Sequence, residues 1–430
     1  MRSVEEQLAL ITAAAVHPEP VRIAIVDALG LMCAEDIEAS ADLPGFAQAA
    51  IDGYAVRAVD VGGEVGISNR NQPETQSGGR ALEPVERSLP VVGEVAAGSQ
   101  TPLRLQPKQA VRVHTGAPLP TLADAVLPLG WSDRGRNRVV ATRAVRSGDF
   151  VRRPGDDISR GDLAVSAGSV LGAAQIGLLA AAGRSHVLVY PKPRVSIISV
   201  GAELVDVHRT PALGQVFDVN SYSLSAAARE AGADVHRVGI AAGEPRRLRE
   251  VIEAQMMRSE AIVIAGAVGG SGSRVVRDIL NELGDIDTTR VAVHPGSVQG
   301  FGVLGENKTP VFLLPSNPVS ALVGFEVFVR PLIRLALGKR NYTRRTVRAR
   351  ALNHITSRIG RRGYIRARLM RDAHTQDYLV EGLGGATGAP AHLLAGLAEA
   401  NALILIPEDA PEIRPGDIVD VMFLAQGTGR

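Results

Sequence analysis

The sequence contains one cysteine, Cys33, and few aromatic residues, which make up 3% of the chain. A single cysteine excludes an intramolecular disulfide framework and fits a reducing compartment. The apolar residues around Cys33 predict a buried structural thiol rather than a nucleophile. The scarcity of aromatic side chains also removes the stacking platforms on which single-stranded nucleic acids bind.

Long apolar runs and a strong charge imbalance are absent too. No run of 18 uninterrupted apolar residues occurs, so no transmembrane helix is expected. Glu5 and Glu6 interrupt the N-terminal stretch and make it a poor signal peptide. The net charge of +2 is too small to indicate nucleic acid by itself. We therefore expect a cytoplasmic protein of two to four domains, since 430 residues with 45% hydrophobic content can form large cores.

One basic stretch, 339–371, carries twelve Lys or Arg residues and no acid. It suits either a nucleic-acid stripe or a solvated face that meets an acidic protein partner. Arg348 and Arg350 alternate with apolar residues, and so do Arg366 and Arg368. This period of two predicts strands whose arginines face solvent. We expect no nucleic-acid partner.

The chain is organised around three short apolar runs that end at Gly or Pro, namely 195–200, 261–265 and 311–314. Such runs are typical of strands buried on both faces of a parallel sheet. Between the first two runs, Asn220 is a suitable N-cap for a helix over 221–230, and apolar residues recur at helical spacing over 248–256. The pattern predicts a doubly wound α/β domain that binds ligands beyond the carboxyl ends of its strands.

A glycine-rich loop, 265–274, follows the second run. Its glycines leave backbone N–H groups free to face an anion, and a helix follows. The spacing matches neither common nucleotide-binding motif, so a flexible turn is the alternative interpretation.

The remaining segments predict smaller elements. Residues 3–15 form an amphipathic pattern with Leu8, Leu10 and Ile11 toward a core, and Arg22–Met32 suggests a second helix. Short strands between Gly and Pro over about 53–145 predict a small β module, and strands alternate again over about 342–430. Residues 317–337 predict one long apolar helix whose first turn contains Pro318.

Eight motifs in order resemble the molybdopterin molybdenumtransferase family, which includes the E domain of gephyrin. Examples are LPGFAQAAIDGYAV at 43–56, VHTGAPLPTLADAVLPL at 113–129 and LLPSNPVSA at 313–321. The resemblance implies a helical domain (1–46 and 146–190), a small β domain (47–145), an α/β molybdopterin-binding-like domain (191–338) and a C-terminal β-barrel (339–430). It also implies an elongated homodimer. Family enzymes insert molybdate into adenylylated molybdopterin with the help of Mg²⁺ and release the nucleotide.

The resemblance carries over a set of site residues. Asp52 and Glu203 are the implied catalytic and metal-binding acids. The implied substrate-binding residues are Thr115, Asp157, Gly266, Gly269, Ser271, Arg274, His294, Ser297, Pro315, Asn317 and Pro318. Structural roles are the alternative for the acids: Asp52 precedes a glycine and suits a turn, and Asp157 suits a helix cap.

The sequence departs from the family at several of these positions. Arg274 stands where the family has Asp, and His294 and Ser297 stand where it has lysines. These changes remove a carboxylate for Mg²⁺ and two cations for an anionic substrate. They favour a catalytically impaired, gephyrin-like dimeric adaptor. Leu8 would then line a groove for a short peptide from the cytoplasmic tail of a membrane or filament-forming protein.

Two alternatives to the adaptor remain. The first is an active molybdenum insertase, in which Arg274 binds phosphate or molybdate in place of the lysines. The second is a protein that stores molybdopterin without chemistry.

Overall fold

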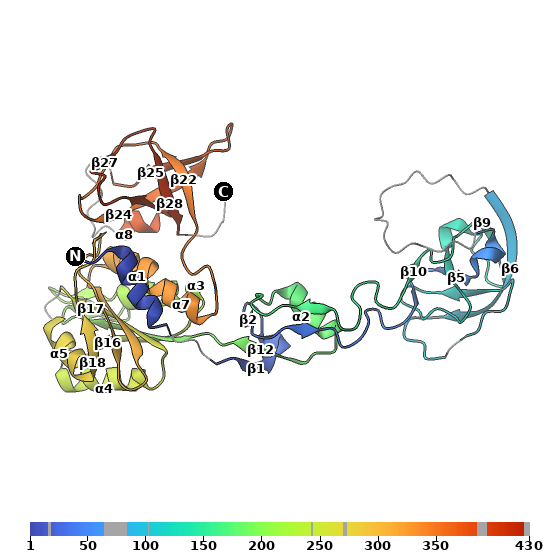
Figure 1. The fold of residues 1–430 in the computed structure, drawn as a ribbon, viewed down its shortest axis with the longest axis horizontal. Helices are drawn as coiled ribbons and strands as arrows, with labels where there is room; N and C mark the ends of the chain where they lie inside the picture. The colour runs from blue at the N-terminus through green and yellow to red at the C-terminus, as the bar shows by residue number, and fades with distance from the viewer. Residues whose placement is uncertain are drawn as a thin grey trace. The chain divides into compact units, whose positions relative to one another are not determined.

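The computed structural model describes residues 1–15, 19–63, 84–101, 103–241, 244–269, 273–384 and 394–424. The chain divides into two compact units, drawn in Figure 1. The first unit comprises Met1–Arg22 and Leu188–Arg430, and the second comprises Ile23–Val187. Each unit is described by itself below.

The first unit contains a six-stranded sheet in the order β16-β13-β17-β21-β20-β18. Its strands are β13 (Arg194–Val200), β16 (Asp234–Ala241), β17 (Ala261–Val268), β18 (Gly284–Asp287), β20 (Gly300–Leu304) and β21 (Thr309–Pro315). The first four strands of that order run parallel to one another. Strand β20 is antiparallel to β21, and β18 is antiparallel to β20. The three predicted strands are confirmed as the parallel centre β13-β17-β21, where β17 is buried along its whole length.

Helices cover both faces of this sheet (Figure 1). One face packs against α1 (Val4–Ala13), α3 (Asn220–Ala231), α6 (Pro318–Gly324) and α7 (Arg330–Ala336), and the other against α4 (Pro245–Met256) and α5 (Ser273–Leu283). Side chains alternate along each strand, so Ile197 faces one helical layer and Ile198 the other. The doubly wound prediction is confirmed.

The C-terminal part of this unit is a closed five-stranded β-barrel, which confirms the expected fold class. Its strands are β22 (Thr346–Ala351), β24 (Arg362–Arg371), β25 (Tyr378–Gly382), β26 (Ala402–Ile406) and β28 (Ile418–Phe423). The pairing of β24 with β26 closes the ring. The short strands β19 (Val293–His294), β23 (Ile355–Thr356) and β27 (Glu412–Ile413) and helix α8 (Leu394–Ala398) complete it. Closure removes exposed sheet edges.

The second unit contains a five-stranded sheet in the order β8-β5-β7-β6-β9. Its strands are β5 (Gly53–Val56), β6 (Pro84–Val95), β7 (Ala110–Val113), β8 (Ala125–Pro128) and β9 (Arg138–Arg143). Short strands and one helix make up the rest: β1 (Val21–Ala24), β2 (Met32–Cys33), β3 (Ile37–Glu38), β4 (Gln48–Ala49), β10 (Val151–Arg152), β11 (Leu163–Val165), β12 (His186–Tyr190) and α2 (Ala173–Ala181). Cys33 is fully buried, and burial raises the pKa of its thiol, as a structural role requires.

The long apolar helix over 317–337 is confirmed with one irregularity. Asn317 caps it by accepting a hydrogen bond from Ser320 N at 3.1 Å, and Pro318 occupies the first turn. A π-helical segment, Phe325–Val329, joins α6 to α7. Its apolar side chains are buried inside the same chain, so this helix offers little apolar surface for a partner. The expected homodimer stays a prediction.

Four local predictions are wrong. Arg22–Met32 forms β1, a 3₁₀ turn and β2 instead of a helix, because β12 pairs with both strands. Leu10 is 45% exposed, whereas Leu8 and Ile11 do pack on the core. Asn220 lies inside α3, where the Asp218 carboxylate accepts the hydrogen bond from Ser221 N.

Arg366, expected on a solvent face, is the fourth. It is only 4% exposed, because α8 covers this part of β24 and the Arg366 guanidinium lies against Gly396. Arg348, Arg350 and Arg368 are exposed as predicted.

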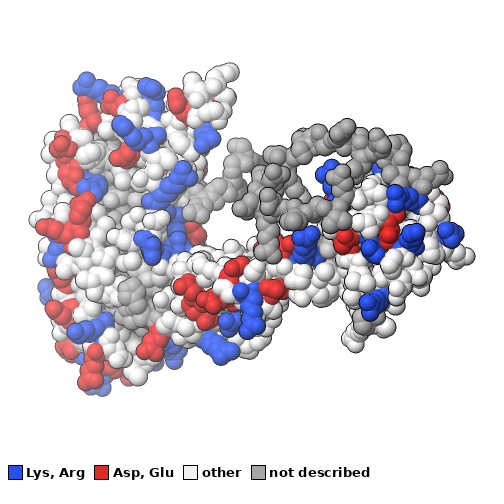
Figure 2. All heavy atoms as spheres, turned by 45° about the vertical axis from the view of Figure 1, so that its right-hand side comes forward, with Lys and Arg blue, Asp and Glu red and all other residues white. Residues whose placement is uncertain are grey.

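Surface charge and helix length bear on two further expectations. Figure 2 shows acidic and basic side chains intermixed on the visible face. The expected absence of a nucleic-acid partner stays a prediction. Among the residues that the structure describes, no helix is both long and apolar enough to cross a membrane.

Candidate functional site

A cavity of about 400 Å³ lies beyond the carboxyl ends of the parallel strands, where a doubly wound sheet binds its ligands. We call it the edge cavity. Its walls come from the segments that follow β13 and β17, from the start of α3 and from the turn between β21 and α6. They comprise Val200, Glu203, Leu204, Val216, Phe217, Val219, Asn220, Ala265, Gly266, Ser316, Asn317 and Pro318. The structure thus brings together four of the residues carried over from the family, and Pro315 ends β21 beside them.

Gly266 allows β13 and β17 to approach each other at the edge cavity. Its φ is +84°, and a Cβ at this position would stand 2.0 Å from the Val200 carbonyl oxygen. Both the conformation and the close approach require glycine. Gly269 also has a positive φ, of +76°, but a Cβ there would meet nothing within 4 Å.

These two glycines give a matched pair for a stability measurement. We expect Gly266→Ala to lower the free energy of unfolding by about 2–5 kcal/mol, from the left-handed conformation and from overpacking together. Gly269→Ala should cost only about 1–2 kcal/mol, because the left-handed backbone conformation is then the only source of strain. Urea denaturation followed by circular dichroism measures both. If both variants lose the same free energy of unfolding, a Cβ at position 266 does not clash with the Val200 carbonyl oxygen.

Two buried polar residues beside the edge cavity have unsatisfied atoms. Asp218 is 1% exposed, and its Oδ1 accepts hydrogen bonds from Ser199 Oγ at 2.8 Å and Ser221 N at 3.0 Å, whereas Oδ2 has no partner. Asn220 donates from Nδ2 to the Ser316 carbonyl at 2.8 Å, and its Oδ1 has no partner. A buried acceptor without a partner is costly. Asn220 lies on the cavity wall, so its Oδ1 is the candidate acceptor for a ligand's N–H group, whereas Asp218 is not on the wall.

A cationic group adjoins the start of α6. A Cβ on Gly296 would stand 3.2 Å from the Ser320 carbonyl, so the loop 294–297 lies beside the first turn of α6. Arg361, which precedes β24, donates from Nη1 to Ser297 Oγ at 3.3 Å. Burial lowers the pKa of His294, and the neighbouring Arg358 and Arg361 guanidinium groups lower it further.

Neither Arg358 nor Arg361 has a carboxylate partner within ion-pair distance in the part of the chain that the structure describes. The barrel therefore brings two uncompensated guanidinium groups to the loop where the sequence lacks the family lysines. Such a pair can hold an oxyanion.

Two predicted residues of the glycine-rich loop, Gly269 and Arg274, lie away from the edge cavity, and a third is not described. Ser271 lies outside the described residues. Gly269 follows β17, and Arg274 is an exposed residue in the first turn of α5. Neither Gly269 nor Arg274 is on the wall of the edge cavity.

The second unit holds another part of the predicted set. Asp52 Oδ1 accepts hydrogen bonds from Thr115 N and Thr115 Oγ1, both at 2.8 Å. These two bonds lower the pKa of Asp52, with smaller contributions from His114 and Arg112. Next to them, His114 Nε2 and Glu94 Oε1 are 2.6 Å apart, and that contact lowers the pKa of Glu94.

Valine has nearly the same shape as threonine, so the hydroxyl of Thr115 can be removed by substitution with little change in packing. We expect Thr115→Val to raise the pKa of Asp52 toward its ordinary value, because one of two hydrogen bonds to the carboxylate is lost. A lowered pKa stabilises the fold above the unfolded-state pKa, and this stabilisation is lost as pH falls through the folded-state value. Carbon-13 NMR titration of Asp52 measures the change. Thr121→Val, in an exposed turn of the same unit, is the control; an unshifted Asp52 in T115V would contradict the expectation.

Asp157 does not cap a helix, so that alternative is wrong. Its backbone N–H donates to the Leu43 carbonyl at 3.0 Å in an irregular segment, and its side chain is exposed. The described residues contain no group of three or more His, Cys, Asp or Glu side chains that could hold a metal ion. Asp52 and Glu203 lie in different units. Within the described residues, therefore, no cluster of protein ligands for Mg²⁺ is found.

Sequence reasoning missed the residues that are most distinctive in space. Asp218 is not among the residues that the sequence singles out, and Asn220 is predicted only as a helix cap. Arg358 and Arg361 were part of a basic stretch, and nothing in the sequence indicated that they lie beside Ser297.

The fold and the edge cavity define a multidomain α/β protein with a cavity at the carboxyl ends of a parallel sheet. Family models match almost the whole chain: the MoeA N-terminal region (domain I and II) at residues 2–183, a probable molybdopterin binding domain at 196–335, and the MoeA C-terminal region (domain IV) at 348–424.

Among curated relatives, molybdopterin molybdenumtransferase 1 of Mycobacterium tuberculosis is 60% identical over 426 residues, which span 99% of this chain and 100% of the relative. Molybdopterin molybdenumtransferase 2 of the same organism is 35% identical over 99% of this chain and 100% of the relative. A crystal structure of the molybdopterin biosynthesis MoeA protein from Pyrococcus horikoshii superposes with a TM-score of 0.78 at 30% identity, covering 99% of both chains.

The chain belongs to the molybdopterin molybdenumtransferase (MoeA) family. Its central domain matches a molybdopterin-binding domain, which confirms the molybdopterin expectation at that level. The prediction of a catalytically impaired adaptor is wrong: full-length identity of 60% to a molybdopterin molybdenumtransferase favours the enzyme, and nothing supports a scaffold role. Leu8, assigned to a peptide groove, is partly buried against the central core.

Proposed function

We propose that this protein is an active molybdopterin molybdenumtransferase that transfers molybdate to adenylylated molybdopterin. The observation that carries the proposal is the 60% identity over 426 residues to molybdopterin molybdenumtransferase 1. Two features support it. Asn220, on the wall of the edge cavity, has an unpaired acceptor, and two guanidinium groups without carboxylate partners adjoin the loop 294–297 next to α6, so N–H donors and anionic groups of a ligand can each find a partner.

Each part of the site has a proposed task. Asn220 Oδ1 accepts a hydrogen bond from an N–H group of the pterin and so orients its ring. Arg358 and Arg361 hold the molybdate oxyanion beside Ser297. Gly266 keeps the strand ends close, so that ligand and backbone amides can approach. Positioning of the two substrates lowers the entropic part of the barrier.

Mg²⁺ enters this proposal only together with the substrate. Mg²⁺ is commonly held by one or two carboxylates plus substrate phosphates. Since no three protein ligands gather among the described residues, phosphate oxygens of the adenylylated substrate would have to complete the set.

Binding of the adenylylated substrate tests the assignment of the edge cavity. We expect Asn220→Ala to weaken binding by about 10- to 100-fold, because a buried hydrogen bond to the ligand and the bond to Ser316 are both lost. Fluorescence titration of the pterin measures the dissociation constant. The matched control is Asn353→Ala, which removes an amide that bonds to Gly382 in the barrel. Equal affinities of the wild type and N220A would place the pterin elsewhere.

A further inference from the structure

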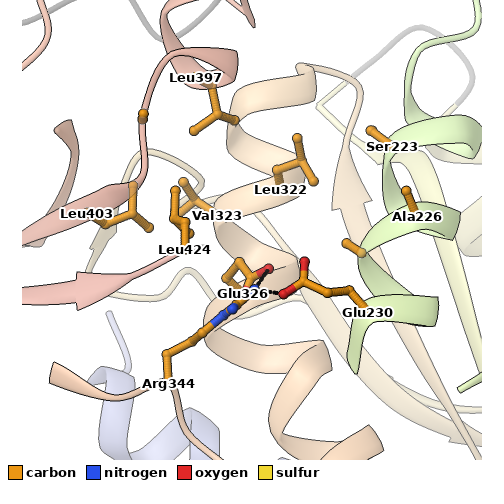
Figure 3. Close-up of a pocket in the computed structure, with 12 residues that line it drawn as sticks. Ser223, Ala226, Glu230, Leu322, Val323, Glu326, Arg344, Leu397, Leu403 and Leu424 are labelled. Atoms are coloured by element: carbon orange, nitrogen blue, oxygen red, sulfur yellow. Dashed lines mark hydrogen bonds and ion pairs between the residues drawn. The ribbon is translucent and has the colours of Figure 1, made fainter. Parts of the chain in front are cut away.

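A second cavity of about 400 Å³ lies in the first unit, between the α/β domain and the barrel. Figure 3 shows its walls, which come from α3, α6, α8 and the barrel strands. Most of the wall is apolar and consists of Leu322, Val323, Leu397, Leu403 and Leu424, with small side chains of α3 opposite. A cavity of this size with mostly apolar walls is typical of small-molecule sites.

The floor of this second cavity is polar. Glu326 accepts hydrogen bonds from Arg344 Nε at 2.7 Å and Nη2 at 3.0 Å, and Glu230 Oε1 lies 2.9 Å from the same Nη2 (Figure 3). The Arg344 side chain is only 3% exposed, yet its Nη1 has no hydrogen-bond partner. The Glu230 side chain is 52% exposed. The floor therefore offers one unsatisfied donor and one accessible carboxylate.

These groups define the chemistry of an occupant. The wall carries Glu230, Glu326 and Arg344, and buried Arg330 lies 3.8 Å from both glutamates. The two carboxylates and two guanidinium groups sum to zero, so neither an anion nor a cation gains much there. Arg344 Nη1 needs an acceptor, and Glu230 needs a donor, and a hydroxyl meets both requirements. We propose that the second cavity binds a neutral small molecule with an apolar body and one hydroxyl-like polar end.

The same helices connect this cavity to the edge cavity. Asn220 at the start of α3 lines the edge cavity, and Ser223 and Ala226 on the next turn line the second cavity. Likewise Pro318 lines the edge cavity, whereas Leu322, one turn later, lines the second. An occupant that separates or clamps α3 and α6 shifts the residues at their N-terminal ends. The second cavity is therefore an effector site for the edge cavity.

The probe for this proposal is 2-naphthol, which is neutral near pH 7 and carries one hydroxyl. Methyl NMR spectra of the full chain, labelled at Leu and Val, follow its titration. We expect saturable shifts at Leu322, Leu397 and Leu403, with a dissociation constant on the order of 1 mM for a ligand of this size. Val219, on the wall of the edge cavity, should shift with the same saturation curve. If the three leucines show no saturable shifts, the binding proposal is overturned. If the leucines shift but Val219 does not, the proposal that this cavity is an effector site is overturned.

Two variants and a second probe complete the test. Ala226→Trp fills the cavity from an exposed position of α3, and it should abolish the shifts. Ala254→Trp, at an exposed position of α4, should leave them unchanged. The anion 2-naphthoate should bind about tenfold more weakly than 2-naphthol; equal or tighter binding overturns the neutral class.

A second copy of the chain is the competing occupant. If A226W shifts the oligomeric state in light scattering, and the leucine methyl groups of the wild type do not respond to 2-naphthol, the cavity is an interface and the proposal is wrong. None of these measurements depends on molybdenum insertion. A failure of the second-cavity proposal can therefore be distinguished from a failure of the proposed enzymatic function.

Discussion

Replacing Glu326 with alanine should lower the free energy of unfolding by about 3–5 kcal/mol. Glu326 is 8% exposed and pairs with Arg344 at 2.7 Å and with Arg330 at 3.8 Å. Both arginines are themselves nearly buried, and burial lowers the pKa of Arg330. Without Glu326, two guanidinium groups remain in the core with only Glu230, which is half exposed, to compensate them. Uncompensated buried charge is among the most costly defects in a fold.

Chemical denaturation followed by circular dichroism measures this loss. The matched control is Glu399→Ala, because Glu399 pairs with Arg368 at 3.9 Å and both side chains are largely exposed. Solvent screening limits that pair to less than about 1 kcal/mol. A loss below about 1 kcal/mol in E326A would mean that water reaches the cluster, which would contradict a buried ion-pair network beneath the second cavity.

The double substitution Arg358→Ala with Arg361→Ala should lower kcat/KM for molybdate by about 10²- to 10⁴-fold. Each guanidinium is proposed to make a charge-assisted hydrogen bond worth about 1.5–3 kcal/mol, and each 1.4 kcal/mol is a factor of ten. The effect should fall on molybdate rather than on the adenylylated pterin, because the two arginines adjoin Ser297 and not Asn220.

The control for this prediction removes the same charge from the same barrel. Arg348→Ala with Arg350→Ala changes two exposed arginines of β22, so kcat/KM should remain within about twofold of the wild type. If both double variants lose activity equally, general electrostatic attraction explains the effect and no specific oxyanion site exists at Arg358 and Arg361.

The central sheet could be predicted because its strands are buried on both faces. Residues 261–265 are continuously apolar, and residues 195–200 are apolar except for Ser196 and Ser199, whose buried hydroxyls are hydrogen-bonded. The start of α6 was equally clear, since Asn317 and Pro318 form a cap and a first turn that are independent of tertiary contacts. Local chemistry and burial together determine these elements.

The failures have a common physical cause in contacts between distant segments. Residues 22–32 pair with a strand more than 150 residues later, so their local apolar spacing was misleading. The period of two around Arg366 was correct, but α8 covers that face. The adaptor prediction likewise judged the loop 294–297 by its own residues. Arg358 and Arg361 reach it from the barrel, and no spacing rule connects these positions.

Turnover with both substrates tests the central claim most directly. Purified protein is mixed with adenylylated molybdopterin with and without molybdate, and the released nucleotide and the molybdenum in the pterin product are quantified by mass spectrometry. We expect nucleotide release to depend on molybdate and to equal the molybdenum incorporated, with the N220A and R358A/R361A proteins impaired. Tight binding of the adenylylated pterin without molybdate-dependent release in the wild-type protein would contradict the proposed function.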